Sequence, residues 1–230
     1  VLDLAHPALT VALFGAEPQL LALIDVGLER VVAALRPDAA PEEAWFPLAG
    51  VRLLAPLPRP RRIAAVAYNY RDALAERSMP PPEAPVLFEK LPDTVVGPGE
   101  AVILPPGIGG VTYEAELAAV IGRPARNVKA EDALGFVAGY FAFNDISASE
   151  MIRADGSFER GKNFATFGPS GHWLASADEI PDPHALAVRM TVSGAVRQSS
   201  STAQMLFGVA DLIAFLSAQG EGLKAGDVIA

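Results

Sequence analysis

Two glutamates lie in the middle of an apolar run, and they constrain the fold more than any other feature of the chain. The run is V-T-Y-E-A-E-L-A-A-V-I, residues 111–121, in which one residue separates Glu114 from Glu116. Alternate residues of a β-strand share a face, so a single strand here places both carboxylates on one side, about 6.6 Å apart along the strand. Two like charges beside apolar neighbours repel each other and lose hydration. A cation held between them removes that cost.

Asp145 supplies a third carboxylate. It follows the apolar stretch 137–144, which reads as a buried strand, so Asp145 is expected at a strand end. Oxygen ligands without His or Cys suit Mg²⁺ or Mn²⁺, with Ca²⁺ as a substitute, better than Zn²⁺. Three protein ligands leave positions on an octahedral ion open for substrate and water. The alternative, on these residues alone, is that Glu114 and Glu116 lie on the solvated face of an edge strand.

The rest of the chain predicts many short strands and few helices. Apolar runs between turn residues predict strands at 63–67, 85–88, 101–104, 111–121 and 137–144, and a hairpin that starts at 186–192. Apolar residues at i, i+3 and i+4 predict single helices over 18–36 and within 202–218, with short helical turns at 69–77 and 129–136. This pattern predicts an α+β domain, mainly β, built on antiparallel or mixed sheet.

Proline-rich segments predict the domain organisation. A linker at 37–43 and the prolines of 56–60 separate a small N-terminal segment, residues 1–50, from a main domain, residues 51–230. The chain opens on a strand-like stretch, Val1 to Leu4, and closes on 226–230, which reads as a strand just beginning. A strand that stops midway leaves backbone groups unpaired, so we expect both parts to be truncated and the natural protein to continue.

Composition argues against several classes of protein. The formal net charge is −9, and the only basic cluster is Arg59, Arg61 and Arg62, which argues against binding to nucleic acid or to anionic membranes. The chain has no cysteine, which excludes disulfides and thiolate metal sites. No apolar run reaches the roughly 18 residues of a membrane span, and no basic region precedes an apolar one as in a signal peptide. A cytoplasmic location is therefore expected.

The order of several short segments resembles the fumarylacetoacetate hydrolase family in its bacterial form. The resemblance covers roughly residues 50–230 and rests on the combination of motifs. These are Asn69-Tyr70-Arg71-Asp72, Pro85-Val86-Leu87-Phe88-Glu89-Lys90, Val96-Gly97-Pro98-Gly99, Tyr113-Glu114-Ala115-Glu116-Leu117, Asn144-Asp145-Ile146-Ser147-Ala148, Arg160-Gly161-Lys162 and Gly226-Asp227-Val228-Ile229.

The resemblance implies a fold, a metal and a substrate class. The implied fold is a β-roll-like catalytic domain, to which the sequence adds a small helical or extended N-terminal segment, and the implied assembly is a homodimer. The resemblance places Mg²⁺ or Mn²⁺ on Glu114, Glu116 and Asp145, and it implies small 2-oxo acid substrates. Lys162 matches a catalytic lysine near the metal-bound substrate, and Lys90 and Gln198 match positions that line the pocket.

Departures from the family pattern leave the reaction open. Family hydrolases activate water with a His and a Glu three residues later; here Glu76 is present, but Ala73 replaces the His, and a methyl group cannot take a proton. Glu76 could still act as a base if burial raised its pKa. Ser149 and Ala165 also replace residues that are usually polar in the family.

Three readings follow from these departures. C–C bond hydrolysis of an acylpyruvate-type 2-oxo acid is the default, and a tautomerase or decarboxylase acting on an oxaloacetate-type substrate is the alternative within the family. A non-catalytic member that acts as a binding protein is the third. Of the histidines, we expect His6 and His184 on the surface and His172 packed structurally.

Overall fold

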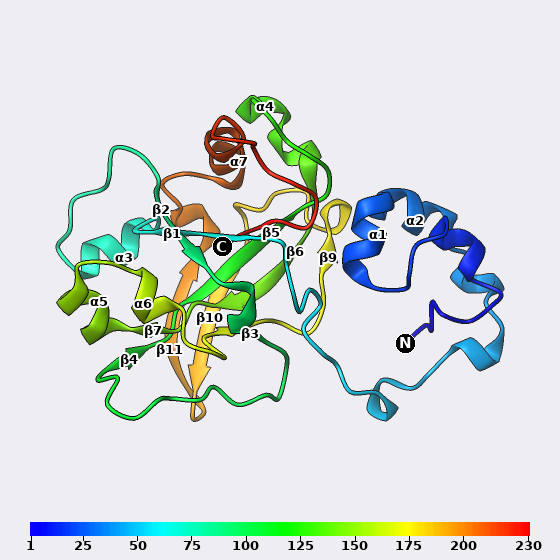
Figure 1. The fold of residues 1–230 in the computed structure, drawn as a ribbon, viewed down its shortest axis with the longest axis horizontal. Coiled ribbons are helices and arrows are strands. Elements are labelled where there is room, and N and C mark those ends of the chain that lie inside the picture. Colours follow the sequence, from blue (N-terminus) through cyan, green and yellow to red (C-terminus); the bar gives the residue numbers. More distant parts are fainter.

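A six-stranded mixed sheet forms the centre of the molecule. In the computed structural model, which describes residues 1–230, the strand order is β2-β1-β12-β5-β6-β9 (Figure 1). In that order the strands are Val86–Lys90, Ile63–Ala67, Val228–Ile229, Ala115–Ile121, Val137–Asn144 and Ala175–Ser176. Strand β12 runs parallel to β1 and antiparallel to β5, which makes the sheet mixed.

Three two-stranded sheets complete the β-structure. A hairpin pairs β10 (Ala187–Val192) with β11 (Ala195–Ser201), as the sequence predicts. A parallel pair joins β3 (Val95–Val96) to β8 (Gly168–Pro169), and an antiparallel pair joins β4 (Val111–Thr112) to β7 (Ser147–Ala148). The predicted α+β class, with more strands than helices and with mixed sheets, is confirmed.

Helices cover both faces of the central sheet. They are α1 (Leu20–Val26), α2 (Leu28–Ala34), α3 (Arg71–Glu76), α4 (Ala130–Ala133), α5 (Ser149–Asp155), α6 (Glu159–Lys162) and α7 (Val209–Ser217). Ile121 of β5 packs in the core that α7 builds with Leu212 and Ile213. The neighbouring Val120 points to the opposite face and packs in the core that includes Ile24 of α1. This alternation is the period of a strand buried on both sides. No helix has the length and hydropathy that a membrane span requires.

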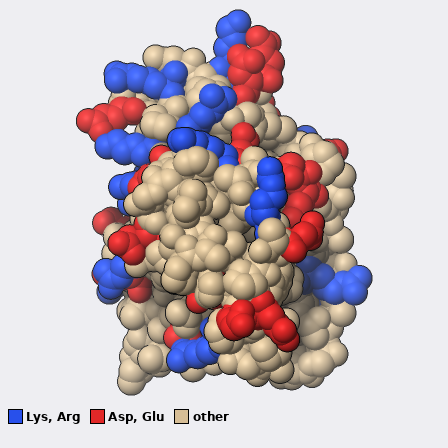
Figure 2. Space-filling model, turned by 90° about the vertical axis from the view of Figure 1, so that its right-hand side faces the viewer, with Lys and Arg blue, Asp and Glu red and all other residues tan.

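The first 50 residues form a small helical module beside the sheet (Figure 1). Leu13, Leu23 and Val31 make a cluster of their own there. The module is attached to the sheet through Ile24 and through an ion pair of 2.6 Å between Arg61 Nη2 and Asp25 Oδ2. Figure 2 views this side of the molecule and shows acidic and basic side chains interspersed around a broad uncharged area.

Two helix predictions need correction. The single helix predicted over 18–36 is two helices, because Gly27 between α1 and α2 adopts φ 99°, outside the helical region. The predicted helix within 202–218 is preceded by a short 3-10 turn, and α7 begins only after Gly208. Asp211 accepts a hydrogen bond from the Gly208 amide at 2.9 Å and fixes that start.

Three strand predictions also need correction. The run 111–121 is divided into β4 and β5, because the backbone turns away at Glu114 to meet Asn144 and Asp145. No strand forms at 101–104, where the amide of Ile103 donates instead to the Thr166 hydroxyl at 2.8 Å. The first residues make one isolated bridge, between Leu2 and Trp45, instead of a strand.

Candidate functional site

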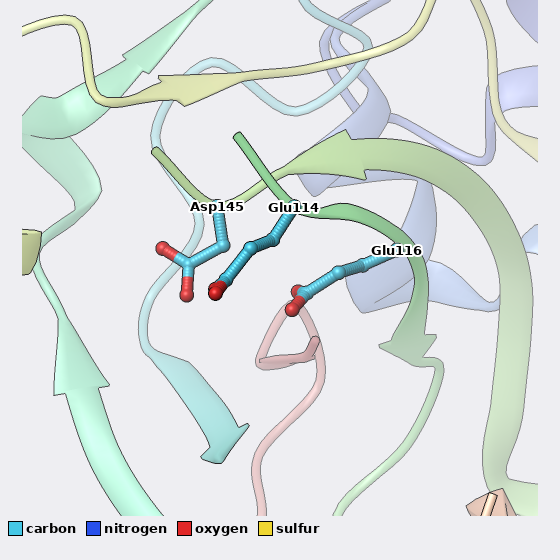
Figure 3. Close-up of side chains that lie close together, drawn as sticks. All are labelled: Glu114, Glu116 and Asp145. Carbon is cyan, nitrogen blue, oxygen red and sulfur yellow. The ribbon is translucent and has the colours of Figure 1, made fainter. Parts of the chain in front are cut away.

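The ends of β5 and β6 bring the three predicted carboxylates together. Asn144 pairs with Ala115 at this end of the two strands, and the amide of Asp145 donates to the Glu114 carbonyl at 2.9 Å. The amide of Glu114 donates to the Asn144 side chain at 3.1 Å. Each of Glu114, Glu116 and Asp145 has an oxygen within 4.8 Å of the others (Figure 3). Glu114 lies in the break between β4 and β5, so the convergence does not need the single strand that the sequence suggested.

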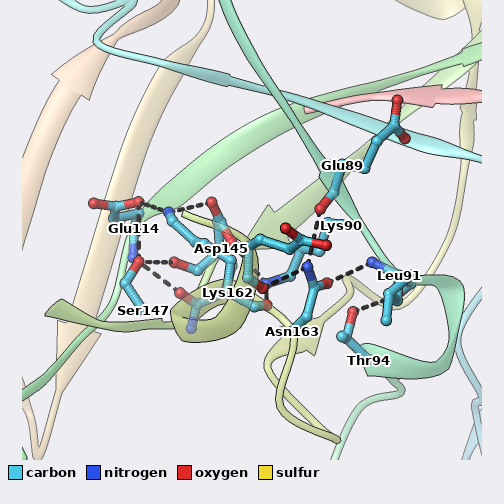
Figure 4. A network of polar contacts seen from close by, with 11 residues as sticks. Glu89, Lys90, Leu91, Thr94, Glu114, Asp145, Ser147, Lys162 and Asn163 are labelled. Atoms are coloured by element: carbon cyan, nitrogen blue, oxygen red, sulfur yellow. Dashed lines mark hydrogen bonds and ion pairs between the residues drawn. The ribbon is translucent and has the colours of Figure 1, made fainter. Parts of the chain in front are cut away.

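Two buried lysines neutralise part of this negative charge. Lys162, the last residue of α6, donates to Glu114 Oε2 at 2.6 Å and to Asp145 (Figure 4). Lys90, the last residue of β2, lies with its ammonium nitrogen 2.8 Å from Asp145 Oδ1. The same nitrogen donates to the carbonyl of Lys162 at 2.6 Å. Lys90 therefore orders both Asp145 and the end of the helix that carries Lys162.

Asn163 ties these two segments together at their backbones. Its side chain accepts from the Leu91 amide at 2.6 Å and donates to the Glu89 carbonyl at 3.0 Å (Figure 4). On the other side of Lys162, the ring of Phe88 lies 5.0 Å from the ammonium nitrogen, within cation–π range. Asn163, the residue after Lys162, thus joins the backbone on both sides of Lys90, and Phe88 contacts the Lys162 ammonium group.

Burial and the surrounding charges shift the pKa values of three of these groups in different directions. Burial lowers the pKa of Lys162, but Asp145, Glu114 and Glu116 outweigh that effect, and the pKa is raised. Burial also lowers the pKa of Lys90, and Asp145 does not fully compensate. Burial and the charge of Asp145 raise the pKa of Glu116 well above its usual value. Glu116 is the carboxylate with the least compensation from the protein.

The donor set fits a divalent metal ion. Glu116 Oε2 is buried and has no hydrogen-bond partner, and such atoms are rare in folded proteins. Glu114 keeps 28% of its side chain exposed, so the cluster is open to solvent on that side. Three carboxylates without nitrogen or sulfur donors suit Mg²⁺ or Mn²⁺. Glu114, Glu116 and Asp145 are therefore the residues that could hold such an ion, as the sequence predicts.

Gln198 supports the strand that carries the glutamates. Its side chain accepts from the Ala115 amide at 2.9 Å and donates to the Ala115 carbonyl at 3.3 Å. Ala115 lies between Glu114 and Glu116, so the hairpin β10–β11 holds the backbone of both. The predicted contact of Gln198 with substrate stays a prediction.

The structure does not provide the burial that a base at Glu76 requires. Glu76 is exposed at the end of α3, and Ala73 on the same helix carries no titratable group. His184 is not a free surface residue, because its Nε2 accepts from the Val209 amide at 3.0 Å and caps α7. His172 does not pack in the interior either: it is exposed beside Trp173, which is 66% exposed. None of the three histidines contacts the carboxylates.

Sequence reasoning missed two contacts of Glu114. Arg77 follows α3 and lies with Nη2 3.6 Å from Glu114 Oε1. The hydroxyl of Ser147 lies 3.4 Å from Glu114 Oε2 and donates to the Asp145 carbonyl at 3.2 Å. Ser147 belongs to the Asn144–Ala148 motif, which is the signal that could have indicated it. Arg77 ends the helical turn predicted at 69–77, and nothing in the sequence indicates its contact with Glu114.

A small cavity lies behind Glu116. Its volume is about 20 Å³, close to the space of one water molecule. Tyr70 and Glu116 are among the lining residues, and the Tyr70 hydroxyl is buried without a partner. Burial and the charge of Glu116 raise the pKa of Tyr70, so its hydroxyl is a neutral donor. The Tyr70 hydroxyl is thus a hydrogen-bond donor that lines the same cavity as Glu116.

Comparisons with known proteins give one family model and several relatives that this chain resembles. Residues 62–230 match the model of the fumarylacetoacetate (FAA) hydrolase C-terminal domain. A mitochondrial oxaloacetate tautomerase of Homo sapiens is 39% identical over 203 residues, which are 87% of this chain and 64% of that protein. The chain thus spans less than two thirds of the length of that relative.

Solved structures with similar sequences share the fold. A fumarylacetoacetate hydrolase from psychrophilic Exiguobacterium antarcticum superposes with a TM-score of 0.81 at 35% identity, over 96% of this chain and 76% of that one. A 5-carboxymethyl-2-hydroxymuconate delta-isomerase from Mycobacterium smegmatis superposes with a TM-score of 0.72 at 40% identity, over 80% of this chain and 69% of that one.

Proposed function

Because the chain belongs to the fumarylacetoacetate hydrolase family, we propose that it is a divalent-metal-dependent enzyme that interconverts the keto and enol forms of a small 2-oxo acid. The observation that carries the proposal is the placement of Lys162, a buried cation between Glu114 and Asp145, in a cluster that no histidine contacts. Such a site can stabilise an enolate but lacks an evident base for activating water.

The carboxylates and the lysine of the cluster would have different roles in this reaction. Glu114, Glu116 and Asp145 would hold Mg²⁺ or Mn²⁺, which would supply Lewis-acid polarisation of the 2-oxo group. Lys162 is fixed by two carboxylates, so its positive charge is already in position where negative charge develops on a substrate oxygen.

Lys90 would act through its contacts with other residues of the site and would not touch the substrate. Its ammonium group is fully buried against Asp145 and the Lys162 carbonyl, so it positions both and does not contact solvent. Tyr70 and Glu116 meet at a space large enough for one water, which would let the tyrosine hydroxyl support the carboxylate through that water.

Tautomerisation requires less of this site than hydrolysis does. Keto–enol exchange needs a proton donor and acceptor of modest strength, whereas hydrolysis also needs a base that activates water. Ala73 and the exposed Glu76 do not provide a buried base. Of the three relatives described above, one is named as an oxaloacetate tautomerase, one as a delta-isomerase and one as a hydrolase, so the names support isomerase chemistry in this family and do not decide between the reactions.

Hydrolysis of an acylpyruvate is the second candidate function. Glu76, at the exposed end of α3, is the residue that the family resemblance would assign to the activation of water. Decarboxylation of an oxaloacetate-type acid is a further reaction, and the metal ion and Lys162 would stabilise its enolate product in the same way. A non-catalytic binding role would keep the cluster but show no turnover.

One set of assays distinguishes these reactions. Enol oxaloacetate and an acylpyruvate are each followed by ultraviolet absorbance, with Mg²⁺ or Mn²⁺ and with EDTA, for wild type, Glu116→Gln and Glu131→Gln. Metal without protein gives the background rate. We expect enol–keto exchange above background, abolished by EDTA and by Glu116→Gln, and unchanged in Glu131→Gln, whose glutamate is exposed on α4. Cleavage of the acylpyruvate alone would move the assignment to hydrolysis, and turnover of neither substrate would contradict both.

We also propose that the protein acts as a homodimer. Exposed apolar side chains on the segment before β4 support this: Ile103 and Leu104 are more than half exposed. Apolar side chains grouped on a surface often mark an interface. Sedimentation of the protein at micromolar concentration tests the proposal, and a monomer would contradict it.

A further inference from the structure

A second hollow lies at the other end of the strand that leads away from the carboxylate cluster. It is an open groove of about 550 Å³, formed by residues between β5 and β6. Binding sites for small ligands have volumes of this order. The groove follows Ile121, the last residue of β5, whereas Glu114 directly precedes the first, so about 20 Å of strand separate the two places. Figure 1 shows α4, which borders the groove, at the top of the molecule and β4 and β7 at the lower left.

Three basic side chains line this groove, and they are Arg123, Arg126 and Lys129. They occur at every third residue of the loop 122–129, and all three are exposed. Asp132 is the only acidic residue in the lining. The groove therefore carries a net positive charge in a chain whose formal net charge is −9. A local positive potential of this kind attracts anions.

The guanidinium of Arg126 has free hydrogen-bond donors. Its side chain makes no hydrogen bond and no ion pair within the protein. Glu221 lies close enough for its charge to interact with Arg126, but its carboxylate binds the Lys224 ammonium group at 2.7 Å. A free guanidinium presents a planar set of donors that matches two oxygen atoms of a phosphate.

Arg123 is partly engaged, in a way that fixes its orientation. Its Nε donates to the Gly135 carbonyl at 3.1 Å, and its guanidinium lies over the ring of Phe136, 4.1 Å from the centroid. The two Nη groups make no hydrogen bond within the protein and stay available. Arg123 therefore offers donors from a side chain that is already in place.

Lys129 and Asn127 can add further donors. Lys129 pairs with Glu131 at 3.4 Å, but more than 70% of each side chain is exposed. An exposed ion pair contributes little free energy, so an incoming anion can take the place of Glu131. The side-chain amide of Asn127 is a neutral member of the same lining.

The backbone of the loop is held by neighbouring segments. The amide of Asn127 donates to the Ser217 carbonyl and the amide of Val128 to the Ser217 hydroxyl, each at 2.9 Å. Ala125 and Leu223 exchange two hydrogen bonds of 2.9 Å. The loop is thus ordered before any ligand arrives, and a site of this kind loses less conformational entropy on binding.

The charge of the lining fits a phosphate monoester. Three cations and one carboxylate leave two positive charges in excess. A phosphate monoester carries a charge of about −1.5 to −2 near pH 7 and has three acceptor oxygen atoms. A monocarboxylate brings a smaller charge and fewer acceptors. A long polyanion such as nucleic acid is disfavoured, because the chain as a whole is acidic.

We propose that the groove lined by Arg123, Arg126 and Lys129 binds a small phosphate monoester, at a site separate from the carboxylate cluster. None of these three side chains contacts the cluster. The site therefore stands whether or not the protein catalyses keto–enol exchange, and it gives the chain a second kind of ligand.

Calorimetric titration of the metal-free protein with glycerol 3-phosphate tests the proposal. An ionic strength of about 0.15 M screens weak attraction between exposed charges. Wild type should bind the ester with a Kd below about 1 mM, and acetate should bind at least about tenfold more weakly. Arg126→Gln should weaken binding of the ester by about tenfold or more, the size expected for a charged hydrogen bond.

Two variants in the groove sharpen the result. Arg126→Lys keeps the charge but loses the planar two-point contact, so it should retain part of the affinity. Asp132→Asn removes the one carboxylate that repels the anion, so it should tighten binding by about two- to fivefold. A melting temperature close to that of wild type shows that each variant is folded.

Two variants outside the groove serve as controls. Arg189→Gln removes an exposed arginine of β10 and should leave the affinity for the ester unchanged. Glu116→Gln should also bind the ester as wild type does, because the carboxylate cluster is a separate site. Loss of the ester in Glu116→Gln would place the binding at the cluster and overturn the proposal.

Other outcomes would also overturn it. Wild type could fail to bind glycerol 3-phosphate, acetate could bind equally well, or Arg126→Gln could leave the affinity unchanged. Sedimentation with vesicles that contain phosphatidic acid, a lipid with the same phosphate monoester, identifies the source of the ligand. Binding to these vesicles without binding to the soluble ester would assign the groove to a membrane surface instead.

Discussion

The ammonium nitrogen of Lys90 lies 2.8 Å from Oδ1 of Asp145, and both side chains are almost fully removed from solvent. A buried ion pair of this kind contributes little net stability relative to apolar residues of the same size. Removal of one partner is costly, however, because the other charge stays buried. The pair therefore fixes the position of Asp145, and the stability of the fold depends strongly on Lys90.

Lys90→Met should destabilise the fold. Asp145 would keep only Lys162 as a cationic partner, and the expected loss is about 3 kcal/mol, the lower end of the range for a broken buried pair. Urea unfolding measures it. Lys129→Met, which removes an exposed lysine that pairs with Glu131 at 3.4 Å, is the matched control and should cost less than about 0.5 kcal/mol. Equal effects of the two substitutions would show that the Lys90 pair is not critical.

Glu116→Gln should abolish tight metal binding. The amide is close in shape to the carboxylate but has no charge, so the fold should persist while a ligand is lost. Calorimetry with Mg²⁺ or Mn²⁺ should show affinity lowered by more than the roughly 10–100-fold caused by loss of a residue that only orients a ligand. Unchanged affinity in this variant would remove Glu116 from the metal site.

Gln198→Leu should weaken both the hairpin and the metal site. The substitution removes two hydrogen bonds to Ala115, which together contribute about 1–2 kcal/mol to the free energy of unfolding. Because Ala115 separates the two glutamates, metal affinity should also fall, by about tenfold. Gln219→Leu, at an exposed position after α7, should alter neither quantity. A loss of stability with intact metal affinity would limit Gln198 to a structural role.

Asp227→Asn should remove a component of the pH dependence of stability. Burial raises the pKa of Asp227 above its ordinary value, although the Lys224 amide, at 2.8 Å from Oδ2, opposes the shift. The native state therefore binds the Asp227 proton more tightly than the unfolded state, so its contribution is present below the unfolded pKa of about 3.9 and is lost as pH rises through the folded pKa.

A comparison of wild type with Asp227→Asn isolates the contribution of Asp227 to the pH dependence of stability. Asparagine keeps an acceptor for the Lys224 amide but does not titrate. The free energy of unfolding of Asp227→Asn, relative to wild type, should rise with pH above about 4 and then level off. Urea titrations at a series of pH values measure the difference. A difference that falls as pH rises would mean that the native state favours the charged carboxylate.

The convergence of the carboxylates could be predicted, but the break in their strand could not. Acidic side chains within and after apolar runs suggested a shared site for Glu114, Glu116 and Asp145, with a solvated edge strand as the alternative, and the family resemblance favoured the shared site. The break depends on β7, which pairs with β4, and on the Asn144 side chain, which binds the Glu114 amide. Strand β7 and Asn144 lie some 30 residues after Glu114 in the sequence, so no local pattern predicts these contacts.

The break between α1 and α2 and the contacts of Arg77 could not be predicted from the sequence either. An isolated glycine such as Gly27 is often tolerated within a helical pattern, so its positive φ angle is visible only in the structure. Lys90 and Arg77 approach the carboxylates from other elements of the fold. The family resemblance indicated Lys90 through its motif, whereas Arg77 lies in no motif and became visible only by its distance to Glu114.

Strand β12 also affects the order in which the protein assembles. It is the only strand that joins β1 and β2 to β5 and β6 within the central sheet, and it comprises residues 228 and 229. During synthesis on the ribosome, the apolar edges of β1 and β5 are made long before their common partner emerges. Lys90 on β2 and the carboxylates of β5 and β6 then belong to separate halves of the sheet. Until residue 228 emerges, the facing edges of β1 and β5 are therefore unpaired, and open strand edges can pair wrongly.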